Sequence, residues 1–216
     1  MVSLIMKKTK FKRMILAALL AALLSMICAC QKGGAAPVSG SELEALRAQY
    51  PYAQKNEQLA QVSINDIAAF NNSEFAAFVA VTITGAYTTG ETTDSPAEGM
   101  PATATTTYYI PAHVDSVLCQ NSLFGGQNEI TLRIRGAMDG DNLNCYQTGK
   151  KLVTMLTFPA AGLNALADEY FSGTESSFYI SDNNVLLAMS DQHPAFNEYS
   201  GWNLDAFRQE LKKKFS

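Results

Sequence analysis

The chain has 216 residues, of which 47% are hydrophobic and 17% charged, and its formal net charge is −4 at pH 7. The first 29 residues hold five basic residues and no acidic one, so residues 30–216 combine 11 Lys and Arg with 20 Asp and Glu, a net charge of −9. Such an acidic surface repels phosphate backbones and anionic headgroups, which argues against nucleic-acid binding. The length beyond residue 29 suffices for one domain with a sizeable core, or for one domain and a flexible arm.

The N-terminus is basic and then apolar. The run 14–27 (MILAALLAALLSMI) is uncharged, matches the apolar region of a secretory signal, and is shorter than the roughly 20 residues of a membrane-spanning helix. It is preceded by five basic residues, Lys7, Lys8, Lys10, Lys12 and Arg13. This combination predicts an export signal.

The apolar run ends in the sequence Ile27-Cys28-Ala29-Cys30. It resembles the lipobox of bacterial lipoproteins, in which the thiol of the last cysteine is alkylated by a diacylglyceryl group and a signal peptidase cuts before it. The resemblance implies a signal peptide over 1–29, lipidation at Cys30, and an exported protein held by lipid on the outer face of the cell membrane or on the outer membrane. The alternatives are an ordinary secretory signal, with Cys30 a plain thiol, and an uncleaved membrane anchor.

The segment after the signal is small, polar and rich in glycine, which predicts a flexible tether over 30–40. Ser41 and Glu44 have the spacing of a capping box, so a short helix is expected over 41–48, ending before Pro51. A second short helix is expected over 63–70. From residue 41 onward the chain is predicted to form a single domain.

The first strong strand is expected over 75–87, and because both of its faces are apolar it should be central, with a bend at Gly85. Residues 88–107 form a low-complexity run rich in Thr, Ala and Pro, which predicts a mobile loop. The loop is either a tolerated insertion or an arm that contacts a partner. A second strand over 108–119 contains Pro111, which favours an edge or a bulge.

The clearest alternation of apolar and polar residues lies in a third strand over 130–135. Ile130, Leu132 and Ile134 are expected to face the core, and Thr131, Arg133 and Arg135 to face water. A polar loop over 136–146 and a turn at 148–150 lead to a fourth strand over 152–158. There follow a helix over 160–171, a hairpin over 177–189 with its turn at 182–184, and an amphipathic helix over 203–215 that Asn203 caps.

The order of these elements predicts a mainly β (α+β) fold, an antiparallel barrel of five to six strands with short peripheral helices and a C-terminal amphipathic helix. It resembles a group of exported bacterial proteins with an OB-like barrel, through the apolar first strand, the alternating third strand, Gly149-Lys150 before the fourth strand, and the final hairpin. OB folds usually place their helix before the fourth strand, whereas this sequence predicts one after it. The resemblance implies a fold and no established activity.

Cys119 and Cys145 are the two cysteines that remain after Cys28 and Cys30. Outside the cytoplasm they would either form a disulfide, contributing roughly 3 kcal/mol, or stay free as small core residues. The sequence leaves both alternatives open.

No residue pattern indicates a catalytic, metal or cofactor site. His113 and His193 lack the local spacing of zinc ligands, and a pairing of His113 with Cys119 would separate them by about 20 Å along one strand. The loop around Asp139 and Asp141 lacks the later ligands of a calcium loop, so it is expected to be a solvated loop.

Aromatic residues are the remaining candidates for ligand contact. OB-like barrels use such rings to stack on bases or sugars, and the acidic charge disfavours bases. The candidates are Tyr108, Tyr109, Tyr146 and Trp202. The leading hypothesis is a non-catalytic, lipid-anchored binding or scaffold module of the cell envelope that contacts an envelope protein or glycan. The alternatives are a glycan- or peptide-binding protein that uses the aromatic rings, and a hydrolase whose residues converge only in the fold.

Overall fold

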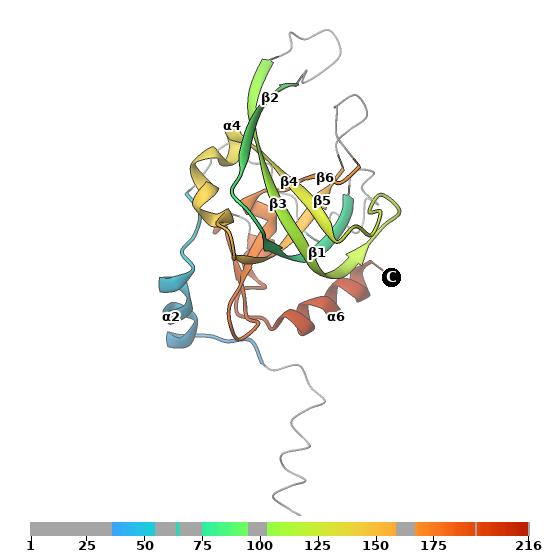
Figure 1. Cartoon of the computed structure of the whole chain (residues 1–216). Helices are drawn as coiled ribbons and strands as arrows, with labels where there is room; N and C mark the ends of the chain where they lie inside the picture. Colours follow the sequence, from blue (N-terminus) through green and yellow to red (C-terminus); the bar gives the residue numbers. More distant parts are fainter. Residues whose placement is uncertain are drawn as a thin grey trace, which may run out of the picture. The chain divides into compact units, whose positions relative to one another are not determined.

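Five β-strands close into a small barrel in the computed structural model, which describes residues 36–54, 64, 75–94, 103–158, 167–192 and 194–215. The barrel strands are β1 (Phe75–Ile83), β3 (Thr103–Gln120), β4 (Glu129–Arg135), β6 (Glu169–Phe171) and β5 (Lys151–Thr157), in that spatial order, and β5 pairs with β1 to close the circle. The fold is therefore mainly β and OB-like, as the sequence predicted. Figure 1 shows how the strands and helices of the domain are arranged.

One strand pair departs from the predicted antiparallel sheet. β6 runs parallel to β4, with Arg133 opposite Phe171, while all other pairs are antiparallel. The predicted helix over 160–171 is wrong at its end, because Glu169–Phe171 is this strand; residues 159–166 lie outside the described residues. The chain leaves β5 and inserts β6 between β5 and β4, which makes the barrel mixed.

The first barrel strand is buried on both faces, as its apolar sequence predicted. Val79 and Val81 face the barrel interior, whereas Phe78 and Ala80 face outward, and all four are at most 2% exposed. Opposite β1, strand β3 has two bulges, which bend a strand as a narrow barrel requires. β1 ends at Ile83, and the chain bends at Gly85, where a Cβ would lie 3.0 Å from the Pro111 ring.

The predicted loop over 88–107 is wrong for its described parts. β2 (Thr88–Asp94) pairs along its whole length with the first part of β3, and the two strands project from the barrel as a twisted ribbon (Figure 1). Threonine is a good strand former, and here its β propensity outweighs the low complexity of the segment. Residues 95–102 lie outside the described residues.

Short helical turns replace the polar loop expected over 136–146. They are α4 (Gly136–Asp139) and η1 (Gly140–Tyr146), and they lie between the third and fourth barrel strands, where OB folds usually place their helix. After β6 the chain forms η2 (Thr174–Ser176) and the predicted hairpin of β7 (Ser177–Ile180) and β8 (Leu186–Ala188). Asn184 in its turn has φ 58°, a left-handed conformation that Asn tolerates.

The remaining helices are α2 (Ser41–Gln49), α5 (Pro194–Asn197) and α6 (Leu204–Lys214). α2 ends before Pro51 as predicted, but its N-cap is Gly40 with no side-chain hydrogen bond, so the capping box does not form. Asn203 caps α6 as predicted, accepting a hydrogen bond from the Asp205 backbone N–H at 2.9 Å. Ile64 is helical and buried, and the rest of the helix expected over 63–70 lies outside the described residues.

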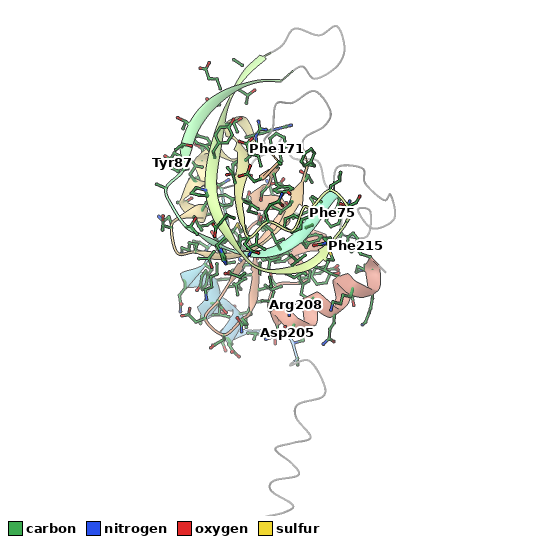
Figure 2. All side chains as sticks on the ribbon, turned by 45° about the vertical axis from the view of Figure 1, so that its right-hand side comes forward. Phe75, Tyr87, Phe171, Asp205, Arg208 and Phe215 are labelled. Carbon is green, nitrogen blue, oxygen red and sulfur yellow. The ribbon has the colours of Figure 1, made fainter. Side chains whose placement is uncertain are left out.

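Two hydrophobic clusters lie on opposite sides of β1. One fills the barrel interior, and α2 packs against it through Leu43 and Leu46. The other lies between the outer face of β1 and the helices α5 and α6, and it is rich in phenylalanine. Figure 2 shows Phe75 of β1 beside Phe215 at the end of α6, with ring centroids 5.0 Å apart.

The predicted signal peptide and the lipidation site at Cys30 lie outside the described residues. Within the predicted tether, the Val38 backbone N–H donates to the Gly201 carbonyl at 2.8 Å, so the chain is attached to the domain at that point. None of the helices in the described ranges has the length and apolarity needed to cross a membrane.

Candidate functional site

The outer side of β3, β4 and β6 carries a row of rings and guanidinium groups. Arg133 of β4 pairs across the sheet with Tyr109 of β3 on one side and with Phe171 of β6 on the other. Because residues that are directly opposite share a face of the sheet, the three side chains lie together, and Arg135 lies two residues further along β4 on the same face. We call Tyr109, Arg133, Arg135 and Phe171 the arginine–aromatic face.

Cation–π contacts join its members. The Arg133 guanidinium carbon lies 4.7 Å from the Phe171 ring centroid and 5.5 Å from that of Tyr109, and the Arg135 guanidinium carbon lies 4.7 Å from the Phe171 centroid. Each such contact contributes about 0.5–2 kcal/mol, more where the cation is desolvated. Phe171 therefore holds both guanidinium groups and fixes the spacing of the face.

The sequence prediction that Arg133 faces water is wrong. Its side chain points outward, as the alternation requires, but is only 1% exposed, and its Nη1 lies 3.5 Å from Glu169 Oε2. The carboxylate and the rings offset the desolvation of the guanidinium. A single strand cannot predict this burial, because Phe171 and Glu169 come from β6, which the sequence analysis assigned to a helix.

Three members of the face remain half-buried and so accessible in part: Tyr109, Arg135 and Phe171. The Tyr109 ring leans across β2, where a Cβ at Gly90 would lie 2.9 Å from its Cε2. Glycine at that position thus leaves room for the ring. The face can offer flat rings for stacking and N–H groups for hydrogen bonds, the combination that sugar rings and peptide groups accept.

The other predicted aromatic candidates do not join this face. Tyr108 packs against the interior cluster, with its ring beside Gly136 of α4 and in edge contact with Tyr87, the two ring centroids 5.4 Å apart. Tyr146 is 3% exposed and belongs to the interior cluster, so its ring does not lie on the outer surface of the sheet. Trp202 packs against Tyr199 at 5.1 Å beside the outer cluster. Of the four candidates, only Tyr109 lies on the arginine–aromatic face.

A second polar cluster lies inside the domain, between α4, η1 and η2. Asp139 is 2% exposed, not solvated as the sequence suggested, whereas Asp141 is exposed. The Thr174 backbone N–H donates to Asp139 Oδ2 at 3.0 Å, and Oδ1 accepts from the Thr174 hydroxyl at 2.5 Å and from Asn142 Nδ2 at 3.0 Å. Asp139 thereby ties the segment after β4 to the segment after β6.

Glu175 completes this cluster. Its Oε2 is buried and receives no hydrogen bond from a protein donor, and burial together with the charge of Asp139 raises the pKa of Glu175 to about 7. The Tyr146 hydroxyl is also buried, and burial raises its pKa well above the ordinary value, with Asp139 and Glu175 adding to the effect. We call Asp139 and Glu175 the acid pair.

Cys119 and Cys145 are free thiols, so no disulfide joins them in this structure. Cys145 belongs to the interior cluster and Cys119 packs against the outer one. Burial raises the pKa of Cys119 to about 11 and also raises that of Cys145, which keeps both thiols protonated and poorly nucleophilic at neutral pH.

The described histidine, His113, lies on the surface of β3. Its Nδ1 is 2.5 Å from Glu129 Oε1, and this hydrogen bond raises the pKa of His113. His193 lies outside the described residues. Within the described ranges, no three His, Cys, Asp or Glu side chains are grouped so as to hold a metal ion.

The chain was compared with protein-family models, with curated proteins and with solved structures, and none of them matches it. The class of protein is therefore defined by the fold alone, a small mixed five-stranded β-barrel domain.

Proposed function

We propose that the protein is a non-catalytic binding module of the cell envelope, tethered outside the cytoplasm by a lipid on Cys30, and that the arginine–aromatic face contacts its ligand. The observation that carries the proposal is the row of Tyr109, Arg133 and Phe171 across three neighbouring strands. Chains of sugars fit such a face, because sugar rings stack on aromatic rings and their hydroxyls accept hydrogen bonds from guanidinium groups.

The roles within the face differ. Arg133 is buried and supports the rings from between them, whereas Tyr109, Phe171 and Arg135 keep part of their surface exposed. A rigid sheet holds these groups at fixed spacing, which lowers the entropy lost on binding. The acidic charge of residues 30–216 disfavours nucleic acids, which OB-like barrels otherwise bind through stacked bases.

The first test concerns the lipid tether. Replacing Cys30 with Ser removes the thiol that would be alkylated, so we expect the variant to leave the membrane fraction while the wild-type protein stays there and incorporates a labelled fatty acid. Cys28→Ser serves as the matched control and should behave as the wild type. A Cys30→Ser protein that remains in the membrane fraction, together with an unlabelled wild type, would disprove the tether.

The second test concerns the face. Soluble fragments of cell-wall glycan are titrated into the full chain, and NMR shifts of the backbone amides are followed. We expect shifts to concentrate on β3, β4 and β6. The double variant Tyr109→Leu, Phe171→Leu should weaken binding at least tenfold, because it removes two rings and one ring stacked on a nucleic-acid base already contributes about 1–3 kcal/mol. Tyr87→Leu is the control, because Tyr87 is exposed but lies outside the face.

Equal binding by the double variant and the wild type would place the ligand elsewhere and refute the proposal for this face. Absence of any shift with the glycan fragments would refute the ligand class, and the same titration with unstructured peptides would then test the peptide alternative.

A further inference from the structure

We propose that the segment 38–54 fastens the lipid tether to one end of the domain, and that this end, around Gly201 and Trp202, faces the membrane surface. We call this segment the strap. The inference rests on the lipid at Cys30 that the proposed function includes, and it adds which side of the domain meets the bilayer.

The strap begins directly against Gly201. The Val38 backbone N–H donates to the Gly201 carbonyl at 2.8 Å, and the Gly201 N–H donates to the Leu186 carbonyl of β8 at 2.8 Å. A Cβ at Gly201 would overlap the Val38 carbonyl oxygen, and the φ of Gly201 is 88°, in the left-handed region that favours glycine. Glycine at this position therefore lets the start of the strap lie on the domain.

Arg47 of α2 holds the middle of the strap. Its Nη1 donates to the Ala188 carbonyl at 2.7 Å and its Nη2 to the Ser200 hydroxyl at 2.8 Å. Its guanidinium carbon also lies 3.9 Å from the ring centroid of Tyr52, which is itself part of the strap. Hydrogen bonds from a charged donor are roughly twice as strong as those between neutral groups, so Arg47 is the main polar attachment of α2.

The end of the strap is attached to two further parts of the domain. The Ala53 N–H donates to the Met189 carbonyl at 2.8 Å. The Gln54 N–H donates to Asn142 Oδ1 at 2.7 Å, and Asn142 Nδ2 donates to the Gln54 carbonyl at 3.3 Å. Because the strap is attached at its beginning, middle and end, the free part of the tether ends at Val38.

The free part of the tether is short. Val38 follows Cys30 by eight residues. Eight residues span at most about 29 Å when fully extended, and a flexible chain of that length has an r.m.s. end-to-end distance of about 16 Å. A lipid on Cys30 therefore holds Gly201, and Trp202 beside it, close to the bilayer.

The side chains at this end suit a lipid surface. Tyr52 is 40% exposed and its hydroxyl donates to Asn197 Oδ1 at 3.1 Å, while Trp202 is half-buried. Tyr and Trp rings with a polar tip favour the boundary between membrane and water. Glu198 and Asp205 are exposed at the same end, so a zwitterionic surface fits it better than an anionic one.

Tyr87 provides a reference point on the other side of the domain. Figure 2 shows Tyr87 in the upper part of the barrel and Asp205, three residues after Trp202, in the lower part. Tyr87 is 47% exposed, so a tryptophan fits there without disturbing the core. The proposal predicts that position 202 lies nearer to the bilayer than position 87.

Energy transfer from tryptophan to a dansyl-labelled lipid tests this orientation, because Trp202 is the single tryptophan of the chain. The lipidated wild type and the double variant Trp202→Phe, Tyr87→Trp are each reconstituted in phosphatidylcholine vesicles that carry the dansyl group on the headgroup. Since the tether holds Gly201 within about 29 Å of the lipid, transfer from Trp202 should exceed transfer from position 87 at least about threefold.

A longer tether should remove the constraint. Inserting about 20 Gly and Ser residues between Lys32 and Gly33 raises the r.m.s. length of the free chain to about 29 Å, so transfer from Trp202 should fall at least about twofold. The insertion precedes the strap and leaves all of its contacts in place. It therefore decides the question even if the double variant fails to fold.

The attachment of the strap is tested by amide hydrogen exchange. Arg47→Ala removes the hydrogen bonds to Ala188 and Ser200, so the amides of Val38 and Ala53 should exchange at least about tenfold faster than in the wild type. Gln49→Ala, an exposed position on the same helix, is the control and should exchange as the wild type does.

The outcomes separate this inference from the lipid tether itself. A protein that carries the labelled fatty acid but transfers equally from positions 202 and 87 overturns the orientation and leaves the tether standing. Unchanged transfer after the insertion, or unchanged exchange in Arg47→Ala, overturns the role of the strap. A protein without the fatty acid refutes the tether and this inference together.

Discussion

The barrel wall has two outer faces of opposite chemistry. On β1 and β7 the outward side chains are apolar, and Phe78 and Phe178 pack against Phe207 of α6 with ring centroids 6.2 and 5.2 Å apart. On β3, β4 and β6 the outward rings of Tyr109 and Phe171 instead contact guanidinium groups. The first face is covered by the C-terminal helix, and the second keeps half-buried side chains.

The contrast shows what each face requires. An apolar outer wall exposed to water would cost roughly 25 cal/mol for each Å² left uncovered, so the chain supplies its own cover in the amphipathic helix α6. Rings that contact arginines need no such cover, because the cation–π contacts with the guanidinium groups stay favourable where the side chains are partly exposed to water. One face therefore stabilises the domain, and the other is suited to meet a ligand.

The largest effect should come from opening the covered face. Phe207 is fully buried and contacts Phe78, Phe178 and Tyr199, so Phe207→Ala leaves a cavity between helix and barrel. We expect the free energy of unfolding to fall by about 4 kcal/mol, measured by denaturant titration.

Gln209→Ala, an exposed position on the same helix, is its control and should change stability by less than about 0.5 kcal/mol. A loss below about 1 kcal/mol for Phe207→Ala would mean that α6 is not the cover that this comparison describes.

The covered face was largely predictable from the sequence, because local patterns specify both of its halves. β1 is apolar on both faces, which indicates that something packs on each side, and α6 has an apolar stripe with a capping asparagine. The hairpin of β7 and β8 was equally visible from its turn residues. The pairing of α6 with this particular strand required the structure, and so did the short helix α5, whose Phe196 packs on the same face.

The arginine–aromatic face and the acid pair could not be predicted in the same way. Both depend on short segments, β6 and η2, whose roles come from partners far away in the chain. The alternation in β4 placed Arg133 correctly on the outer face, but its burial depends on Phe171 and Glu169. Likewise Asp139 resembled a loop residue until Thr174 was found to donate to it.

A smaller effect should come from altering the arginine–aromatic face. Arg133→Ala removes the guanidinium from between two rings and takes its positive charge away from Glu169, which is only 13% exposed. We expect the free energy of unfolding to fall by about 3 kcal/mol in the same denaturant titration.

Arg133→Met separates stability from recognition on that face. Methionine fills similar space without charge, and replacing a buried charge by a well-packed apolar side chain is often nearly neutral, so Arg133→Met should stay within about 1 kcal/mol of the wild type. Loss of the guanidinium should still weaken glycan binding, because the rings of Tyr109 and Phe171 lose the group that spaces them. If Arg133→Met instead unfolds the domain as strongly as Phe207→Ala, both outer faces serve stability alike and the division between them fails.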